Sequence, residues 1–252
     1  MKHTFKSPGM SLFKTIGLVL TLGASMTTNA ALLGFGGDSW KEEVLLHDGQ
    51  KIIVKRSQSY GGRSEVGQSA PIKEHSIEFT LPGASNSIKW MSEYGEDLGR
   101  TNFNLRAVHV LNATPYIIAE PNLCLAYNKW GRPNPPYVIF KYEGNAWQRI
   151  TLQALPMEFK TVNVVLSIRG QQVKNLVSAG FISAEKVREL NSHLELAEHR
   201  SILRGELPEG NGCLIPSDAR AKLIAPEING KSLYYNWWPL AQDWLNKTYG
   251  KK

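Results

Sequence analysis

One proline-rich stretch concentrates the residues best suited to recognition. Residues 127–137 read YNKWGRPNPPY and contain three aromatic rings and two cations: Tyr127, Trp130, Tyr137, Lys129 and Arg132. Because proline fixes φ, the stretch is expected to be extended and stiff, so its rings could meet a partner with little loss of entropy. The cations would suit an acidic protein, a glycan or a carboxylate. The alternative is that the prolines route a long loop while Trp130 fills the edge of the core, the commoner place for a large aromatic ring.

The sequence lacks the familiar patterns of catalysis and metal binding. There is no G-x-S-x-G turn for a serine nucleophile, and no HExxH or close histidine pair for zinc. Residues 183–186 match S-x-x-K, in which a lysine activates a serine, but K-T-G and S-D-N are missing and Ser183 is placed to cap a helix. The sequence therefore predicts no catalytic residue, no metal and no cofactor.

The first thirty residues have the three parts of a secretory signal peptide. Three lysines precede an apolar core at 16–24, and small or polar residues follow up to Ala30. The apolar run is shorter than the roughly 20 residues that cross a bilayer. We therefore expect residues 1–30 to be cleaved after Ala30, which leaves no stable membrane span and places the mature chain in the periplasm or outside the cell.

Loss of the signal peptide changes the charge of the chain. Three of the 29 Lys and Arg residues leave with it, so that against 22 acidic residues the formal net charge falls from +7 to +4. A mildly basic, exported domain lacks the clustered positive face that nucleic-acid binding requires. The sequence thus predicts no nucleic-acid partner.

The chain has only two cysteines, Cys124 and Cys213. An even number in an oxidising compartment favours a disulfide, which would close a loop of about 90 residues and stabilise the fold by about 4–5 kcal/mol. Two buried free thiols are the alternative.

Period-two alternation predicts the strands that must carry these residues. The first hairpin joins 43–47 to 51–55 through Asp48-Gly49, a pair suited to a type I′ turn. Three more hairpins are expected, with a ninth strand after them: 77–81 with 88–90, 104–111 with 114–119, 137–142 with 147–152, and 162–168. Successive hairpins indicate a mainly β fold, an antiparallel meander closed as a sandwich, barrel or partial propeller.

The last third of the chain changes from strands to helices. A short helix is expected at 171–179, ending at Gly180, and a second from the cap at Ser183 to about His199, with apolar residues at helical spacing. Pro239 could begin a further helix near the C-terminus. The sequence therefore predicts a single β-rich domain over 31–252, with one or two C-terminal helices and a helical part from about residue 170.

Three stretches resemble a group of exported proteins of Gram-negative bacteria that has no assigned activity: 40–49 (WKEEVLLHDG), 56–59 (RSQS) and 128–137 (NKWGRPNPPY). The resemblance covers about 40–165. It implies a periplasmic setting and supplies no catalytic residues. Two functions remain open: a non-catalytic binding or assembly module for an envelope protein or glycan, favoured by the missing catalytic motifs, and a hydrolase acting on cell-envelope glycan or peptide.

Overall fold

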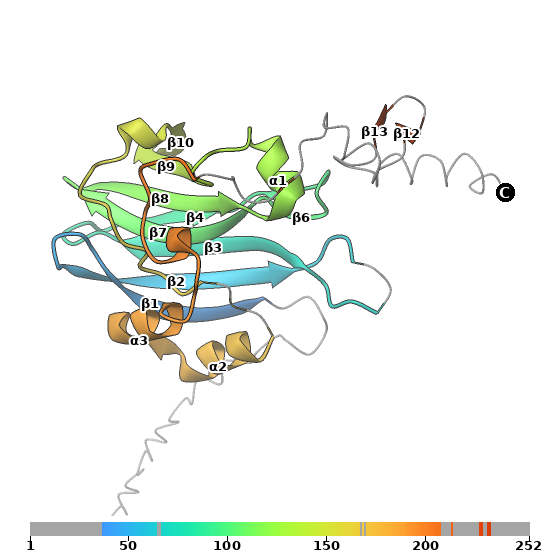
Figure 1. Ribbon diagram of the computed structural model, residues 1–252. Helices are drawn as coiled ribbons and strands as arrows, with labels where there is room; N and C mark the ends of the chain where they lie inside the picture. Colours follow the sequence, from blue (N-terminus) through green and yellow to red (C-terminus); the bar gives the residue numbers. More distant parts are fainter. Residues whose placement is uncertain are drawn as a thin grey trace, which may run out of the picture.

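The computed structural model describes residues 37–64, 67–166, 168, 170–207 and 213, with the backbone of 227–228 and 231–232. The expected signal peptide and the helix expected after Pro239 lie outside the described residues. Figure 1 shows two packed sheets, with two helices beside the edge of one of them.

The first two predicted hairpins form one sheet, in the order β11-β1-β2-β3-β4. Its strands are β1 (Asp38–Leu45), β2 (Lys51–Tyr60), β3 (Ile72–Thr80), β4 (Ser87–Met91) and β11 (Phe181–Ile182). All neighbours are antiparallel except β11, which runs parallel to β1. Gly49 adopts φ 84° in the first turn, but Asp48 does not have the positive φ that a type I′ turn needs. The Leu46 N–H donates to the Gln50 carbonyl, so three residues, 47–49, connect the strands and the predicted type I′ turn was wrong.

The third and fourth predicted hairpins form a second sheet, in the order β10-β9-β8-β7. Its strands are β7 (Phe103–Leu111), β8 (Thr114–Pro121), β9 (Val138–Glu143) and β10 (Ala146–Ile150). Two small ribbons complete the strands: β5 (Tyr94–Gly95) with β6 (Arg100–Thr101), and β12 (Glu227–Ile228) with β13 (Lys231–Ser232). The predicted mainly β, antiparallel fold is confirmed, and the described strands close no barrel.

The main core lies between the two sheets. Val44, Val54 and Ile77 of the first sheet meet Phe103 and Ile117 of the second, all of them buried. Burial alternates along β1 and β2, so these strands pack one face inward and leave the other to solvent.

The ninth strand was predicted wrongly. Within the described part of 161–168, the only strand-like pairing is an isolated bridge from Thr161 to Ser201. Side chains satisfy the backbone instead. Asn191 accepts from the Leu166 N–H and donates to the Val164 carbonyl, while Glu42 accepts from the Val165 N–H. Alternating apolar residues signalled burial correctly, but their partners are not a strand.

Two predicted helices are present, and the second is shorter than expected. α2 (Gln171–Ala179) ends at Gly180, and α3 (Ala184–Asn191) begins at Ser183, whose hydroxyl accepts the Lys186 N–H. The extension to His199 was wrong because the Asn191 side chain is buried against residues 164–166, where α3 ends. A 3-10 turn, η3 (Ala197–His199), follows separately.

Two further turns of helix were not predicted: α1 (Leu123–Lys129) and the 3-10 helix η2 (Leu152–Ala154). Both α2 and α3 contact β1, at the edge of the five-stranded sheet (Figure 1). None of the helices in the described part of the chain is both long and apolar enough to cross a membrane.

Candidate functional site

The stretch 127–137 does not form the extended display expected of it. Its beginning belongs to α1, and the rings of Tyr127 and Tyr137 are 3% and 6% exposed. The Tyr137 hydroxyl donates to the Ser201 carbonyl over 3.1 Å. These two rings thus contact the protein's own interior.

Trp130 fills the edge of the core, which was the alternative to a role in binding a partner. Its ring lies 4.6 Å from that of Phe103, its Nε1–H donates to Asn102 Oδ1 over 3.1 Å, and the guanidinium group of Arg149 lies over the ring at 5.5 Å. Lys129 forms an ion pair of 2.8 Å with Asp97 near the surface. The role of this stretch in capturing a partner stays a prediction.

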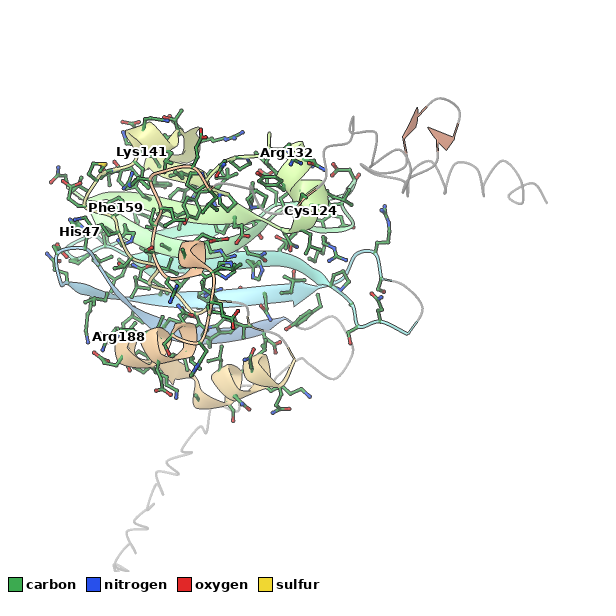
Figure 2. All side chains as sticks on the ribbon, in the orientation of Figure 1. His47, Cys124, Arg132, Lys141, Phe159 and Arg188 are labelled. Atoms are coloured by element: carbon green, nitrogen blue, oxygen red, sulfur yellow. A yellow bond between two sulfur atoms is a disulfide. The ribbon has the colours of Figure 1, made fainter. Side chains whose placement is uncertain are left out.

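The predicted disulfide is present and lies beside the same stretch. Cys124 in α1 is bonded to Cys213, and Arg132 donates to the Cys213 carbonyl over 2.7 Å. The Arg132 guanidinium also stacks over Tyr127 at 4.9 Å. Figure 2 shows Cys124 and Arg132 at one end of the molecule, so Arg132 serves to hold this connection in place.

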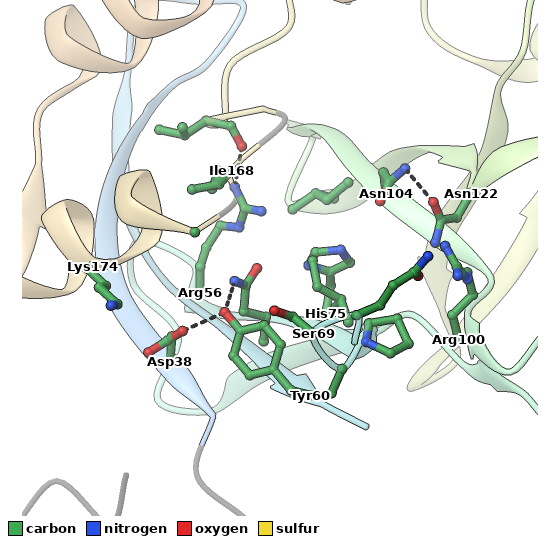
Figure 3. A pocket seen from close by; sticks show the side chains of 18 of the residues that line it. Asp38, Arg56, Tyr60, Ser69, His75, Arg100, Asn104, Asn122, Ile168 and Lys174 are labelled. Carbon is green, nitrogen blue, oxygen red and sulfur yellow. Dashed lines mark hydrogen bonds between the residues drawn. The ribbon is translucent and has the colours of Figure 1, made fainter. Parts of the chain in front are cut away.

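A different region contains a cavity of about 730 Å³, at one end of the space between the sheets. It is lined by the inner faces of β2 and β3, the beginning of β7, residues 68–72 and the N-terminal end of α2 (Figure 3). The inward positions of β2 run Ile52, Val54, Arg56 and Gln58, all buried. The interior of the sandwich therefore changes from apolar to polar along the strand, and the polar end is open.

One row across three strands forms the floor of the cavity. The register pairs Asp38 with Gln58 on β1 and β2, and Gln58 with His75 on β2 and β3. Tyr60 connects the first two side chains: its hydroxyl donates to Asp38 Oδ2 over 2.5 Å and accepts from Gln58 Nε2 over 2.5 Å (Figure 3). Burial and the hydrogen bond to Asp38 raise the pKa of Tyr60 to about 12, so its phenol stays protonated.

The Arg56 guanidinium forms one wall. Its Nη1 donates to Glu42 Oε1 over 3.0 Å and to the Val165 carbonyl over 2.8 Å. Glu42, wholly buried, also accepts from Trp40 Nε1 and from the Val165 N–H. A buried carboxylate is tolerated only when it is paired and hydrogen-bonded, and three donors meet these oxygens. The network holds Arg56 at the cavity with a second terminal nitrogen not engaged by these bonds.

His75 lies near the centre of the cavity (Figure 3) and is 7% exposed. Burial lowers the pKa of His75 to about 3, the Arg56 cation acts in the same direction, and the Asn104 side chain opposes them only in part. The imidazole is therefore neutral, with one N–H donor and one acceptor. Within the described residues neither ring nitrogen makes a hydrogen bond of normal geometry, and the same is true of Gln58 Oε1.

Arg106 supplies a further polar group to the lining. It pairs with Glu120, and one terminal nitrogen lies 2.8 Å from His199 Nε2. Its Nε is buried without a hydrogen-bond partner among the described residues, and burial lowers the pKa of the guanidinium to about 10. The cavity thus holds unused donors, on Arg106 and His75, beside unused acceptors, on Gln58 and His75.

This arrangement is suited to recognition more than to proton transfer. Among the described lining residues Asp38 is the one carboxylate, and it bonds to Tyr60 and not to His75. A histidine with a pKa near 3 and no carboxylate to orient it is a weak general base at neutral pH. In the described part of the chain no group of three or more His, Cys, Asp or Glu side chains could hold a metal ion.

Sequence reasoning missed this site although a signal was present. The prediction ended the strand at residue 55, yet the alternation continues with Arg56 and Gln58 at inward positions. His75 has the same phase as Ile77 and Phe79, which were identified. Polar residues at core-facing positions of a strand are uncommon enough to mark a site.

Comparison of the chain with protein-family models, with curated proteins and with solved structures finds no match.

Proposed function

We propose that this protein is an exported, periplasmic binding protein that holds a small polar ligand in the cavity between its sheets. The observation that carries the proposal is a set of buried polar atoms in the lining that make no hydrogen bond of normal geometry to the described residues: Gln58 Oε1, both ring nitrogens of His75 and Arg106 Nε. A buried polar group left unpaired costs about 1–3 kcal/mol. A ligand that offers matching donors and acceptors would recover part of this energy on binding.

The size and shape of the cavity support the proposal. Its volume of about 730 Å³ lies within the range of about 300–1,000 Å³ typical of small-molecule sites. Leu105, Val165 and Ile168 provide apolar wall between the polar groups. The floor is fixed by strand pairing, and Arg56 is fixed by Glu42, so the groups are organised before a ligand arrives.

Export is supported by the sequence of residues 1–30 and by the disulfide, which forms in oxidising compartments. The resemblance to exported proteins of Gram-negative bacteria points to the same compartment. The ligand is then a molecule of the cell envelope, such as a fragment of glycan or peptide.

The test is retention of small molecules by the purified mature protein. An extract of envelope small molecules is passed over immobilised wild-type protein and over Gln58→Leu and His75→Leu variants, and retained compounds are identified by mass spectrometry. His75→Leu removes ring nitrogens without a bond of normal geometry, so this variant should melt at the same temperature as the wild type or higher, whereas Gln58→Leu also loses the bond from Nε2 to the Tyr60 hydroxyl and should be less stable by about 1 kcal/mol. The wild type should retain a compound that both variants lose.

Gln148→Leu is the matched control, since Gln148 is exposed on β10, away from the cavity lining. It should retain what the wild type retains. The proposal fails if the wild type retains nothing, or if Gln58→Leu and His75→Leu retain the same compounds as the wild type while still folded.

A further inference from the structure

The cavity has more positive than negative charge among its groups. One carboxylate, that of Asp38, lines the cavity. Four cationic side chains line it as well: Arg56, Arg100, Arg106 and Lys174. Glu42 balances Arg56 and Glu120 balances Arg106. Within the described residues, Arg100 and Lys174 have no ion-pair partner. The charge of Asp38 is met in part by the Tyr60 hydroxyl.

A second source of positive potential is the N-terminal end of α2. Gly170 and Lys174, from its first turn, line the cavity. The first N–H groups of a helix have no partners within the helix and carry the positive end of its dipole. Among the residues that the structure describes, no side chain caps them, and the first turn has no acidic residue. Free N–H groups at a helix N-terminus are a common site for anions.

The buried groups need a ligand that also donates. Gln58 Oε1 is an acceptor without a partner in the described part of the chain, and a neutral His75 presents one acceptor nitrogen besides its N–H. An ion without a donor group, such as chloride, would leave these acceptors unpaired. Hydroxyl or amide groups on the same molecule would satisfy them.

Building on the proposed function, we propose that the ligand of this cavity is a small organic anion, a carboxylate or other oxyanion that also carries hydroxyl or amide groups. Its charged group is met by Lys174 and the N–H groups at the start of α2, and Arg100 adds positive charge on the opposite side of the cavity. Its hydroxyl or amide groups bond to Gln58 and His75 on the floor. Figure 3 shows Lys174 and Arg100 on opposite sides of the cavity, with His75 between them.

The experiment separates the envelope extract by ion exchange into acidic, neutral and basic pools before it meets the protein. Each pool is incubated with the wild type, with the double variant Arg100→Gln/Lys174→Gln, and with Lys55→Gln. Lys55 is an exposed cation on β2 that points to the outer face of the sheet, opposite to Arg56, so its loss removes one positive charge, half the change in the double variant, without touching the cavity. Affinity for the retained compound is measured by calorimetry at 50 and 500 mM salt.

The wild type and Lys55→Gln should retain compounds from the acidic pool only. The double variant should bind about tenfold more weakly, and the wild-type affinity should fall at high salt because the Debye length shrinks from about 10 Å near 0.1 M to about 3 Å at 1 M. Retention from the neutral or basic pool alone, or undiminished binding by the double variant, would overturn the assignment of an anion while leaving a binding protein. Retention from no pool would contradict the proposed function itself.

Discussion

Replacing Asn163 with Ala should destabilise the protein more than any other single loss of a carboxamide in the described chain. Asn163 is 6% exposed and lies in the segment that was expected to be a strand. Its Nδ2 donates to the carbonyls of Leu45 and Val108 over 3.0 and 2.7 Å, and its Oδ1 accepts from the Val108 N–H over 2.9 Å. One side chain therefore connects β1 of one sheet to β7 of the other.

The magnitude follows from these three bonds. Each contributes about 0.5–1.5 kcal/mol net, and a buried group left without a partner costs about 1–3 kcal/mol. Water entering the space left by Asn163→Ala would recover some of this energy, so we expect a loss of about 3 kcal/mol. That is a large part of the stability of about 5–15 kcal/mol usual for a domain. Asn163→Asp should cost at least as much at neutral pH, because it sets a carboxylate against two carbonyl oxygens.

Urea unfolding followed by fluorescence measures the effect, with the disulfide intact in all variants. Asn175→Ala is the control, since Asn175 is exposed on α2 and accepts one bond from Gln171 over 3.1 Å. Its change should stay within about 0.5 kcal/mol. A loss below about 1 kcal/mol for Asn163→Ala would show that the segment is held by its apolar residues, and the explanation for the missing strand would be wrong.

Three further predictions concern other parts of the fold. Replacing Cys124 and Cys213 together with Ser should lower the free energy of unfolding by about 4–5 kcal/mol, measured by urea titration; an unchanged midpoint would contradict the loop-closure argument, given the separation of 89 residues. Arg204→Met removes the guanidinium group that donates to the carbonyls of residues 152, 155, 156 and 159, and should lower the free energy of unfolding by about 2 kcal/mol in a urea titration. An unchanged urea midpoint would mean that water replaces the guanidinium group at these carbonyls. Burial lowers the pKa of His75 to about 3 and of His109 to about 4, so the stability that each contributes is complete above about pH 6.5 and is lost as the pH falls toward these values, by about 1.4 kcal/mol per pH unit for each residue. Equal urea midpoints at pH 7 and pH 5 would contradict this last prediction.

The strands were predictable because their signals are local. Alternation and turn residues identified all four hairpins. The register of the first was not predictable, because the type I′ turn expected at Asp48-Gly49 would have paired Asp38 with Ser59, whereas the observed turn is one residue longer and pairs Asp38 with Gln58. The pairing of β2 with β3 was not predictable either, because residues 61–71 separate these strands and the register shifts at Ser59. No local rule sets the pairing of Gln58 with His75.

The site expected at 127–137 shows the opposite failure. Aromatic rings, cations and prolines are common both in loops that bind a partner and in loops that pack against the protein's own core. Only tertiary contacts distinguish them, and Phe103 and Asn102, which receive Trp130, come from a distant part of the chain. Composition could therefore identify the stretch as unusual without assigning its role.

The missing ninth strand and the cavity have a common cause. A strand at 162–168 could pair with only one sheet, whereas the observed segment bonds through Asn163 to both and closes one side of the sandwich. Closing it this way leaves the Val165 N–H without a strand partner, and buried Glu42 accepts it. A buried carboxylate in turn requires a cation, which Arg56 supplies from the neighbouring strand. The irregular segment that replaces the ninth strand therefore also fixes the Arg56 guanidinium group at the end of the core, where Val165 and Arg56 line the cavity.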